Sequence, residues 1–156
     1  MNAIVLGLGN PIRTDDGVGV YAIRQLAAGN LFSRDVRMIE GGTLGLDLLP
    51  SLRGVTHLLA LDAVDTGVAP GTLSRFADEE LANLPINKSV HLLGFADLLG
   101  MINLLDGPPR EVILLGLQPK STDWGTALSP EVEISMRGLV DAARDEISDW
   151  LDRATT

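Results

Sequence analysis

The 156-residue chain contains no cysteine. This absence excludes disulfides, a thiolate nucleophile, iron–sulfur clusters and thiolate zinc sites. No apolar run approaches the roughly 20 residues of a transmembrane helix, and the opening MNAIVLGLGN lacks the basic segment and small-residue cleavage site of a signal peptide. We therefore expect a cytoplasmic protein that makes no membrane contact.

Basic residues are scarce, with 12 Lys and Arg against 21 Asp and Glu and a net charge of −9. Binding to a phosphate backbone depends on clustered Lys and Arg, and the few basic residues here are scattered, so we expect no nucleic-acid partner. Apolar residues make up 46% of the chain, as in ordinary globular proteins. The length predicts one domain spanning residues 1–156, which we expect to be a monomer.

Buried-strand patterns alternate with helical patterns along the whole chain. Strands are predicted at 2–8, 36–40, 57–64 and 111–117, a short edge strand at 71–76, and helices at 17–27, 44–52, 89–105 and 130–151. This alternation predicts a three-layer α/β fold, with a mostly parallel twisted sheet, helices on both faces and one antiparallel edge strand. Residues 118–129 form the one long irregular segment of the second half and are a candidate functional loop.

The first predicted strand runs into GLGNPIRTDDGVG, residues 7–19, which is similar to a phosphate-binding turn. Two early glycines fit a dinucleotide fingerprint, but Ile12 occupies the third glycine position. Asp15 and Asp16 would also repel a phosphate. A tight turn is therefore favoured over a nucleotide site, which stays an alternative.

Ligands of open parallel sheets bind at the carboxyl ends of the strands, where the strand order reverses. If the first strand is central and the third lies beside it, the loop carrying Asp15 and Asp16 meets Asp62, which follows HLLAL. His57 begins its strand and should lie at the opposite end of the sheet. His91 opens a predicted helix, whose positive end favours a neutral, metal-binding imidazole. Two carboxylates and one imidazole would suit a loosely bound divalent ion.

Five motifs occur in one order along nearly the whole chain, and together the chain resembles the nickel–iron hydrogenase maturation endopeptidases. The motifs are GLGNPIRTDDGVG, EGGTLGLDLL, LLALDAV, APGTL and SVHLLGFADLL. In that family an acid in the first loop, an Asp after the third strand and a His at a helix start surround a metal. The resemblance places these roles on Asp16, Asp62 and His91.

The resemblance assigns Asp16 to chemistry and leaves Asp15 to cap the following helix. The first-loop acid of the family is Glu or Asp, and the shorter Asp side chain here suggests contact with the metal through water. Gly41, Gly42 and Thr43 match the family's second glycine loop, which would admit the substrate's extended tail. A plain turn after the second strand is the other interpretation of this segment.

The resemblance implies an endopeptidase that removes the C-terminal extension of a hydrogenase large-subunit precursor after nickel insertion. The precursor would contribute the nickel, and zinc or cadmium would serve as a surrogate in the isolated protein. The lack of cysteine agrees with this expectation, because enzyme thiolates would compete with the substrate's own thiolates for the ion.

Two mechanisms stay open, one metal-assisted with Asp16 or Asp62 as general base, the other an aspartic-type mechanism in which they share a proton. A hydrolase carrying its own divalent metal and a non-enzymatic nickel chaperone are the alternative functions. The candidate partner surfaces are residues 64–71, the face beside His91 and the 118–129 loop. In that loop Trp124 is either an interface anchor or packed on its own domain.

Overall fold

The computed structural model describes residues 1–32, 34–84 and 90–156, and of residues 90–93 the backbone alone. Its centre is a five-stranded sheet in the order β2-β1-β3-β5-β4. The strands are β1 (Ala3–Leu8), β2 (Val36–Gly42), β3 (His57–Ala63), β4 (Leu73–Ala77) and β5 (Glu111–Leu117). All neighbours pair in parallel except β4, which pairs antiparallel with β5 at one edge. The predicted fold class and its edge strand are therefore confirmed.

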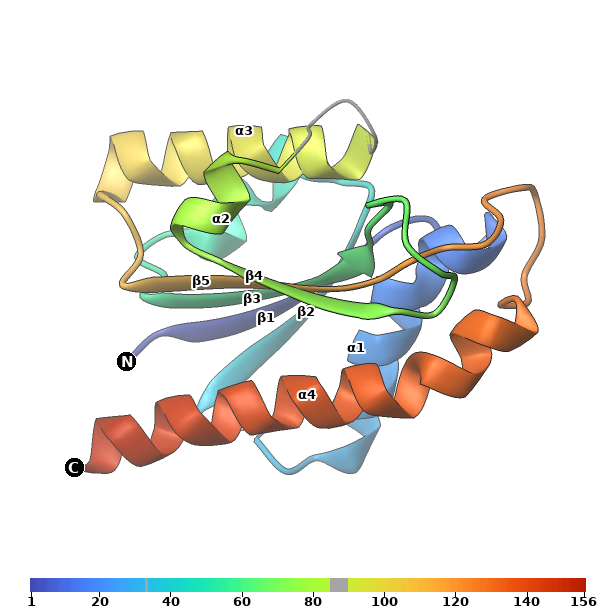
Figure 1. The fold of residues 1–156 in the computed structure, drawn as a ribbon. Helices are drawn as coiled ribbons and strands as arrows, with labels where there is room; N and C mark the ends of the chain where they lie inside the picture. The colour runs from blue at the N-terminus through green and yellow to red at the C-terminus, as the bar shows by residue number, and fades with distance from the viewer. Residues whose placement is uncertain (33, 85–89) are drawn as a thin grey trace.

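Helices cover both faces of the sheet (Figure 1). One face carries α1 (Val18–Gly29) and α4 (Pro130–Thr155), and the other carries α3 (Val90–Asp106) and the 3-10 helix η2 (Gly45–Leu52). Successive strand side chains point to opposite faces, so Leu59 and Ile113 pack toward α1 and α4, whereas Leu58 and Leu114 pack toward α3. Because both faces are covered, the sequences of the three inner strands β1, β3 and β5 are almost continuous apolar runs. None of the described helices is long and apolar enough to cross a membrane.

Two short elements were not predicted from the sequence. They are the 3-10 helix η1 (Thr14–Gly17) and the helix α2 (Glu79–Ala82). Each has four residues, which is too few to show a helical repeat of apolar positions. Of the two, η1 carries the first-loop acids and so bears directly on the site.

His57 lies at the amino end of β3, paired with Ala3, as predicted. Its ring packs against Trp150 of α4, with the ring centroids 5.3 Å apart. Burial lowers the pKa of His57 from its ordinary value of 6.5, and the opposing charge of Glu111 offsets part of this effect. Burial thus favours the neutral form of His57, at the end of the sheet away from the acids.

We expect His57 to make the free energy of unfolding pH-dependent. Its folded pKa lies below its unfolded value, so the unfolded chain binds more protons and stability falls as pH decreases below about 6.5. The contribution is complete above the unfolded pKa and declines as pH falls toward the folded pKa. His57→Phe keeps a ring against Trp150 and removes the titration. Urea unfolding at pH 7.5 and 5.5 should show a smaller loss for the variant; equal losses would contradict this role.

Candidate active site at the carboxyl ends of β1 and β3

The strand order reverses at β1, because the chain goes from β1 to β2 on one side and returns to β3 on the other. In a parallel sheet this reversal opens a crevice at the carboxyl ends of the two central strands. The register pairs Gly7 of β1 with Leu61 of β3, which places Asp62 at the end of β3 beside the start of the first loop. The predicted meeting of the first loop with Asp62 is therefore confirmed.

Gly9 lies against the backbone of Asp16, on the side that faces Asp62. It has a φ of +111°, and a Cβ at this position would lie 1.8 Å from the backbone oxygen of Asp16 and 3.5 Å from Oδ1 of Asp62. Only glycine leaves room for the loop to fold back so closely. The sequence analysis noted Gly9 only as part of a nucleotide fingerprint and missed this role.

The carboxylates of Asp16 and Asp62 differ in environment. Asp16 is half-buried, and its Oδ2 accepts a hydrogen bond from the backbone N–H of Asn10 at 2.9 Å. Asp62 is fully buried, and its Oδ1 accepts a hydrogen bond from the backbone N–H of Ala63 at 2.8 Å. The site therefore offers one carboxylate open to solvent and one held rigidly inside.

The prediction that Asp15 caps the following helix is wrong. The residue before α1 is Gly17, and no side chain caps that helix. Asp15 is fully buried and accepts hydrogen bonds from the backbone N–H groups of Lys120 (2.8 Å), Ser121 (3.1 Å) and Ser129 (2.7 Å) and from the Ser129 hydroxyl (2.8 Å). It therefore anchors the loop after β5 and the start of α4 to the first loop.

Further bonds join this distant loop to the first loop. The backbone N–H of Thr14 donates to the Gly125 carbonyl oxygen at 2.9 Å, and the Gly125 N–H donates to the Ile12 carbonyl oxygen at 2.9 Å. Trp124 is 73% exposed, and the Arg13 guanidinium lies 5.1 Å from its ring centroid. The indole is thus presented to solvent beside the first loop, with a cation from its own chain over the ring.

The glycine segment after β2 lies next to the first loop. Gly42 has a φ of +52°, and its carbonyl oxygen accepts the N–H of Gly9 at 3.0 Å. Thr43 follows and is exposed, whereas Gly41 is buried, with Leu6 2.7 Å from where its Cβ would be. Gly42 and Thr43 are therefore placed to border the crevice, and Gly41 gives close packing beneath them.

His91 lies in the first turn of α3, and its side chain is outside the described part of the structure. The α3 backbone nearby approaches the segment after β2, since a Cβ on Gly94 would lie 3.9 Å from the Cα of Gly45. Among the side chains that are described, no three His, Asp or Glu side chains gather to hold a metal ion. The ligand set of Asp16, Asp62 and His91 stays a prediction.

Gln118 is a buried polar residue that the sequence analysis passed over. Its amide Nε2 donates to Oδ1 of Asp65 at 3.0 Å, and its Oε1 accepts the N–H of Thr66 at 2.9 Å. It thereby joins the loop after β3 to the end of β5. The signal was a polar side chain directly after the apolar run EVILLGL.

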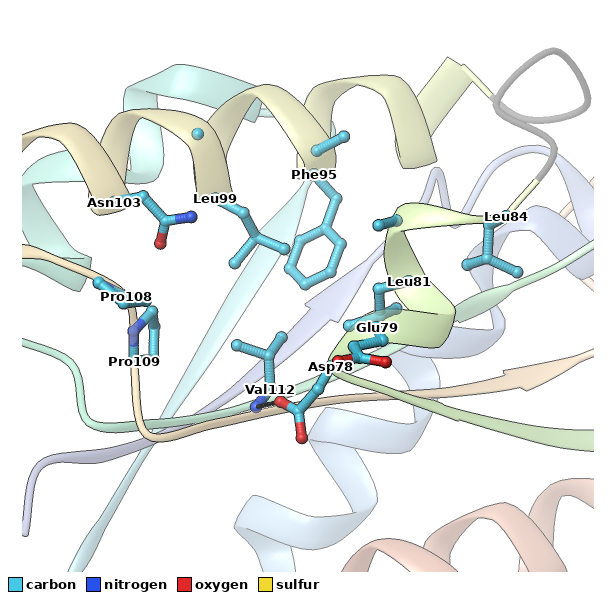
Figure 2. Close-up of a pocket in the computed structure, with 13 residues that line it drawn as sticks. Asp78, Glu79, Leu81, Leu84, Phe95, Leu99, Asn103, Pro108, Pro109 and Val112 are labelled. Carbon is cyan, nitrogen blue, oxygen red and sulfur yellow. Dashed lines mark hydrogen bonds between the residues drawn. The ribbon is translucent and has the colours of Figure 1, made fainter.

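A cavity of about 490 Å³ lies away from these acids, between α2 and α3. Figure 2 shows Phe95 and Leu99 pointing from α3 toward Val112, and Asp78 lies beside Val112. The Asp78 carboxylate accepts the backbone N–H of Val112 at 3.2 Å, which gives it a structural role. This cavity is mainly apolar and contains neither Asp16 nor Asp62.

Two acids at the switch point of a three-layer α/β sheet favour a cationic ligand or acid–base chemistry over phosphate binding. The model of a family described as hydrogenase maturation protease (HycI) matches residues 20–146. The chain therefore belongs to the hydrogenase maturation protease family and is an endopeptidase, as the resemblance predicted.

Relatives and solved structures agree with this assignment. The chain is 36% identical over 135 residues to the hydrogenase 2 maturation protease of Escherichia coli K12, covering 85% of this chain and 82% of that protein. It is 35% identical over 160 residues to the hydrogenase expression/formation protein HoxM of Azotobacter vinelandii, covering 92% of this chain and 77% of that protein. The structure of the hydrogenase maturating endopeptidase HybD from E. coli matches with a TM-score of 0.86 and 31% identity, covering 96% of this chain and 93% of that chain.

Proposed function

We propose that this endopeptidase removes the C-terminal extension from the large-subunit precursor of a nickel–iron hydrogenase. The observation that carries the proposal is the close approach of the first loop, which bears Asp16, to the Asp62 carboxylate in a maturation-protease fold. A structural relative from Thermococcus kodakarensis, with a TM-score of 0.79 and 28% identity over 93% of this chain and 98% of that one, is described as a [NiFe] hydrogenase maturation protease.

Nickel enters the proposal as part of the substrate. The precursor would hold the ion, and Asp16, Asp62 and His91 would contact it from the crevice. Carboxylate and imidazole are weaker ligands for such an ion than thiolates are, and this chain has no cysteine. The enzyme would therefore detect the ion without extracting it, and zinc or cadmium would occupy the same ligands in a surrogate complex.

Hydrolysis needs a base for the attacking water and an acid for the leaving amine. Asp16 is half-buried and open to solvent, so it would take the water proton and pass it to the amine as the C–N bond breaks. Asp62, fully buried and bonded to Ala63, would fix the orientation of the reacting groups. In an aspartic-type version the two acids share one proton, and both versions require Asp16.

A mass measurement on the precursor tests this function. The purified protein is mixed with its hydrogenase large-subunit precursor, nickel-loaded in one sample and nickel-free in the other. We expect loss of a short C-terminal peptide only in the loaded sample. Cleavage in both samples would support the protease activity and refute the dependence of substrate recognition on nickel. No cleavage in either, with the precursor shown competent by another route, would overturn the proposal.

A further inference from the structure

A groove of about 790 Å³ lies between α1 and α4, which cover the same face of the sheet (Figure 1). Residues 126–128 of the loop before α4 also line this α1–α4 groove. Met136 and Val140 of α4 give it an apolar floor, and each is at most 5% exposed. The groove contains neither Asp16 nor Asp62, so it is separate from the crevice.

The α1–α4 groove gathers positive charge on an acidic protein. Arg24, Arg137 and Arg144 line it, three of only 12 Lys and Arg in a chain with a net charge of −9. Two acidic residues, Glu133 and Asp141, line it as well. The charge balance of the described lining residues is therefore positive, whereas that of the whole chain is strongly negative. A negatively charged ligand would be repelled by the chain as a whole and attracted here.

The three arginines differ in how far their hydrogen-bond donors are already used. Arg24 donates to Glu40 through two bonds, of 2.6 and 3.0 Å. Arg137 and Arg144 instead share one carboxylate, that of Asp141. The Nε of Arg137 lies 3.8 Å from it and the Nη1 of Arg144 lies 3.4 Å from it, whereas charge-assisted hydrogen bonds are normally about 2.7–2.9 Å long. Both guanidiniums therefore keep donors for a ligand in the groove.

The spacing of Arg137 and Arg144 matches the repeat of a second helix. Seven residues make about two turns of α4, so the two positions are roughly 10 Å apart along its axis. Val140 lies between them on the floor of the groove. A helix with carboxylates at positions i and i+7 and apolar residues at i+3 and i+4 presents the complementary pattern on one face.

We propose that the α1–α4 groove is a docking site for an acidic amphipathic helix of a partner protein. The carboxylates of that helix would pair with Arg137 and Arg144, and its apolar side chains would cover Met136 and Val140. A guanidinium suits this role because it can bond both oxygens of a carboxylate. Amphipathic helices commonly bind apolar grooves in this way. Docking here does not depend on the proposed cleavage, since neither acid of the crevice takes part.

A docked helix would also lie beside the first loop. Tyr21 lines the groove, and its hydroxyl donates to the Pro11 carbonyl oxygen of that loop at 2.7 Å. The carbonyl oxygen of Thr126, another lining residue, is 3.1 Å from the same hydroxyl. The partner would therefore contact residues that hold the first loop in place, without entering the crevice.

A peptide-binding measurement tests the docking site. The probe is a fluorescein-labelled peptide of about 18 residues, long enough to form a helix in water. It carries Glu at positions i and i+7 and Leu at i+3 and i+4, and the control peptide has Gln at each Glu position. By fluorescence anisotropy the Glu peptide should bind about 10-fold more tightly than the Gln peptide, as expected for two ion pairs. Equal affinities, or no binding of the Glu peptide, would overturn the proposal.

A double variant removes both free guanidiniums. Arg137→Ala with Arg144→Ala should weaken binding of the Glu peptide by about 10-fold. Alanine favours the helix, and thermal unfolding verifies that the fold is retained. The matched control is Arg34→Ala with Arg110→Ala, which removes the same charge from exposed arginines outside the groove and should bind as wild type does. Equal weakening by the two double variants would reduce the effect to net charge and overturn the site.

A gain of affinity gives an independent test, because a damaged fold cannot tighten binding. Asp141→Asn removes the carboxylate that Arg137 and Arg144 share, so the Glu peptide should bind about 2- to 5-fold more tightly. Asp145→Asn changes the net charge equally, about one turn further along α4 and outside the groove. It should leave the affinity unchanged. Equal affinities of the two variants for the Glu peptide would contradict the competition between Asp141 and the ligand.

Two further measurements locate the bound helix and identify its source. The Glu peptide should shift the NMR amide signals of Tyr21, Met136, Val140 and Arg144, and shifts confined to other residues would overturn the site. Sedimentation of the protein alone tests whether a second copy of this chain occupies the groove. Self-association that Arg137→Ala with Arg144→Ala abolishes would assign the groove to a second copy and overturn the separate partner.

Discussion

Asp16→Asn should slow removal of the precursor's extension by about 10²- to 10⁴-fold, the usual contribution of a general base. The amide oxygen of asparagine can still accept the Asn10 N–H, so the loop geometry is retained. Because Asp16 is only half-buried, the melting temperature should stay close to that of wild type. Single-turnover rates on nickel-loaded precursor and thermal unfolding measure the two effects.

The control for this substitution is Asp145→Asn, which removes an exposed carboxylate on α4. It lowers the net negative charge equally and should leave cleavage unchanged. Full cleavage by Asp16→Asn would remove this residue from the metal-assisted and the aspartic-type mechanism alike. A fall in activity that simply followed a fall in melting temperature would mean that Asp16 acts through the fold.

Asp15→Asn, one residue earlier, should instead lower the free energy of unfolding by about 3 kcal/mol. Both oxygens of the buried Asp15 carboxylate accept hydrogen bonds from backbone N–H groups. Oδ2 accepts those of Lys120 and Ser121, and Oδ1 accepts that of Ser129. An asparagine has only one acceptor oxygen, so in either orientation its NH₂ faces a buried donor. Urea unfolding at neutral pH measures the loss.

The matched variant for Asp15 is Ser129→Ala, which removes only the hydroxyl bond at 2.8 Å. It should lower the free energy of unfolding by about 1 kcal/mol. A stability of Asp15→Asn equal to that of wild type would show that these bonds do not hold the two loops together. Comparing Asp15→Asn with Asp16→Asn therefore separates a carboxylate needed for chemistry from an adjacent one needed for structure.

Much of the fold was predictable because its signals are local. Apolar runs bounded by turns located β1, β3 and β5, and the short segment after a Pro-Gly turn indicated the edge strand β4. The rule that parallel sheets bind ligands where strand order reverses predicted that the first loop, which carries Asp15 and Asp16, meets Asp62. The resemblance alone chose Asp16 of the two loop acids.

The errors concern contacts between residues far apart in sequence. Capping rules read only neighbouring residues, so Asp15 was assigned to α1, whereas its partner Ser129 lies 114 residues away. Gly9 was read by its place in a motif, and its role depends on how near Asp62 lies in space. Neither contact leaves a periodic or compositional trace.

The Asp15 anchor also has a consequence for biosynthesis. Contacts between residues far apart in sequence are formed slowly, because the intervening chain must first be ordered. The first loop reaches its final shape only when residues 120–129 are available to bind it, although β1 and α1 are made much earlier. During synthesis the crevice is therefore completed late, and a nascent chain that ends before β5 carries both acids without the scaffold that positions them for cleavage.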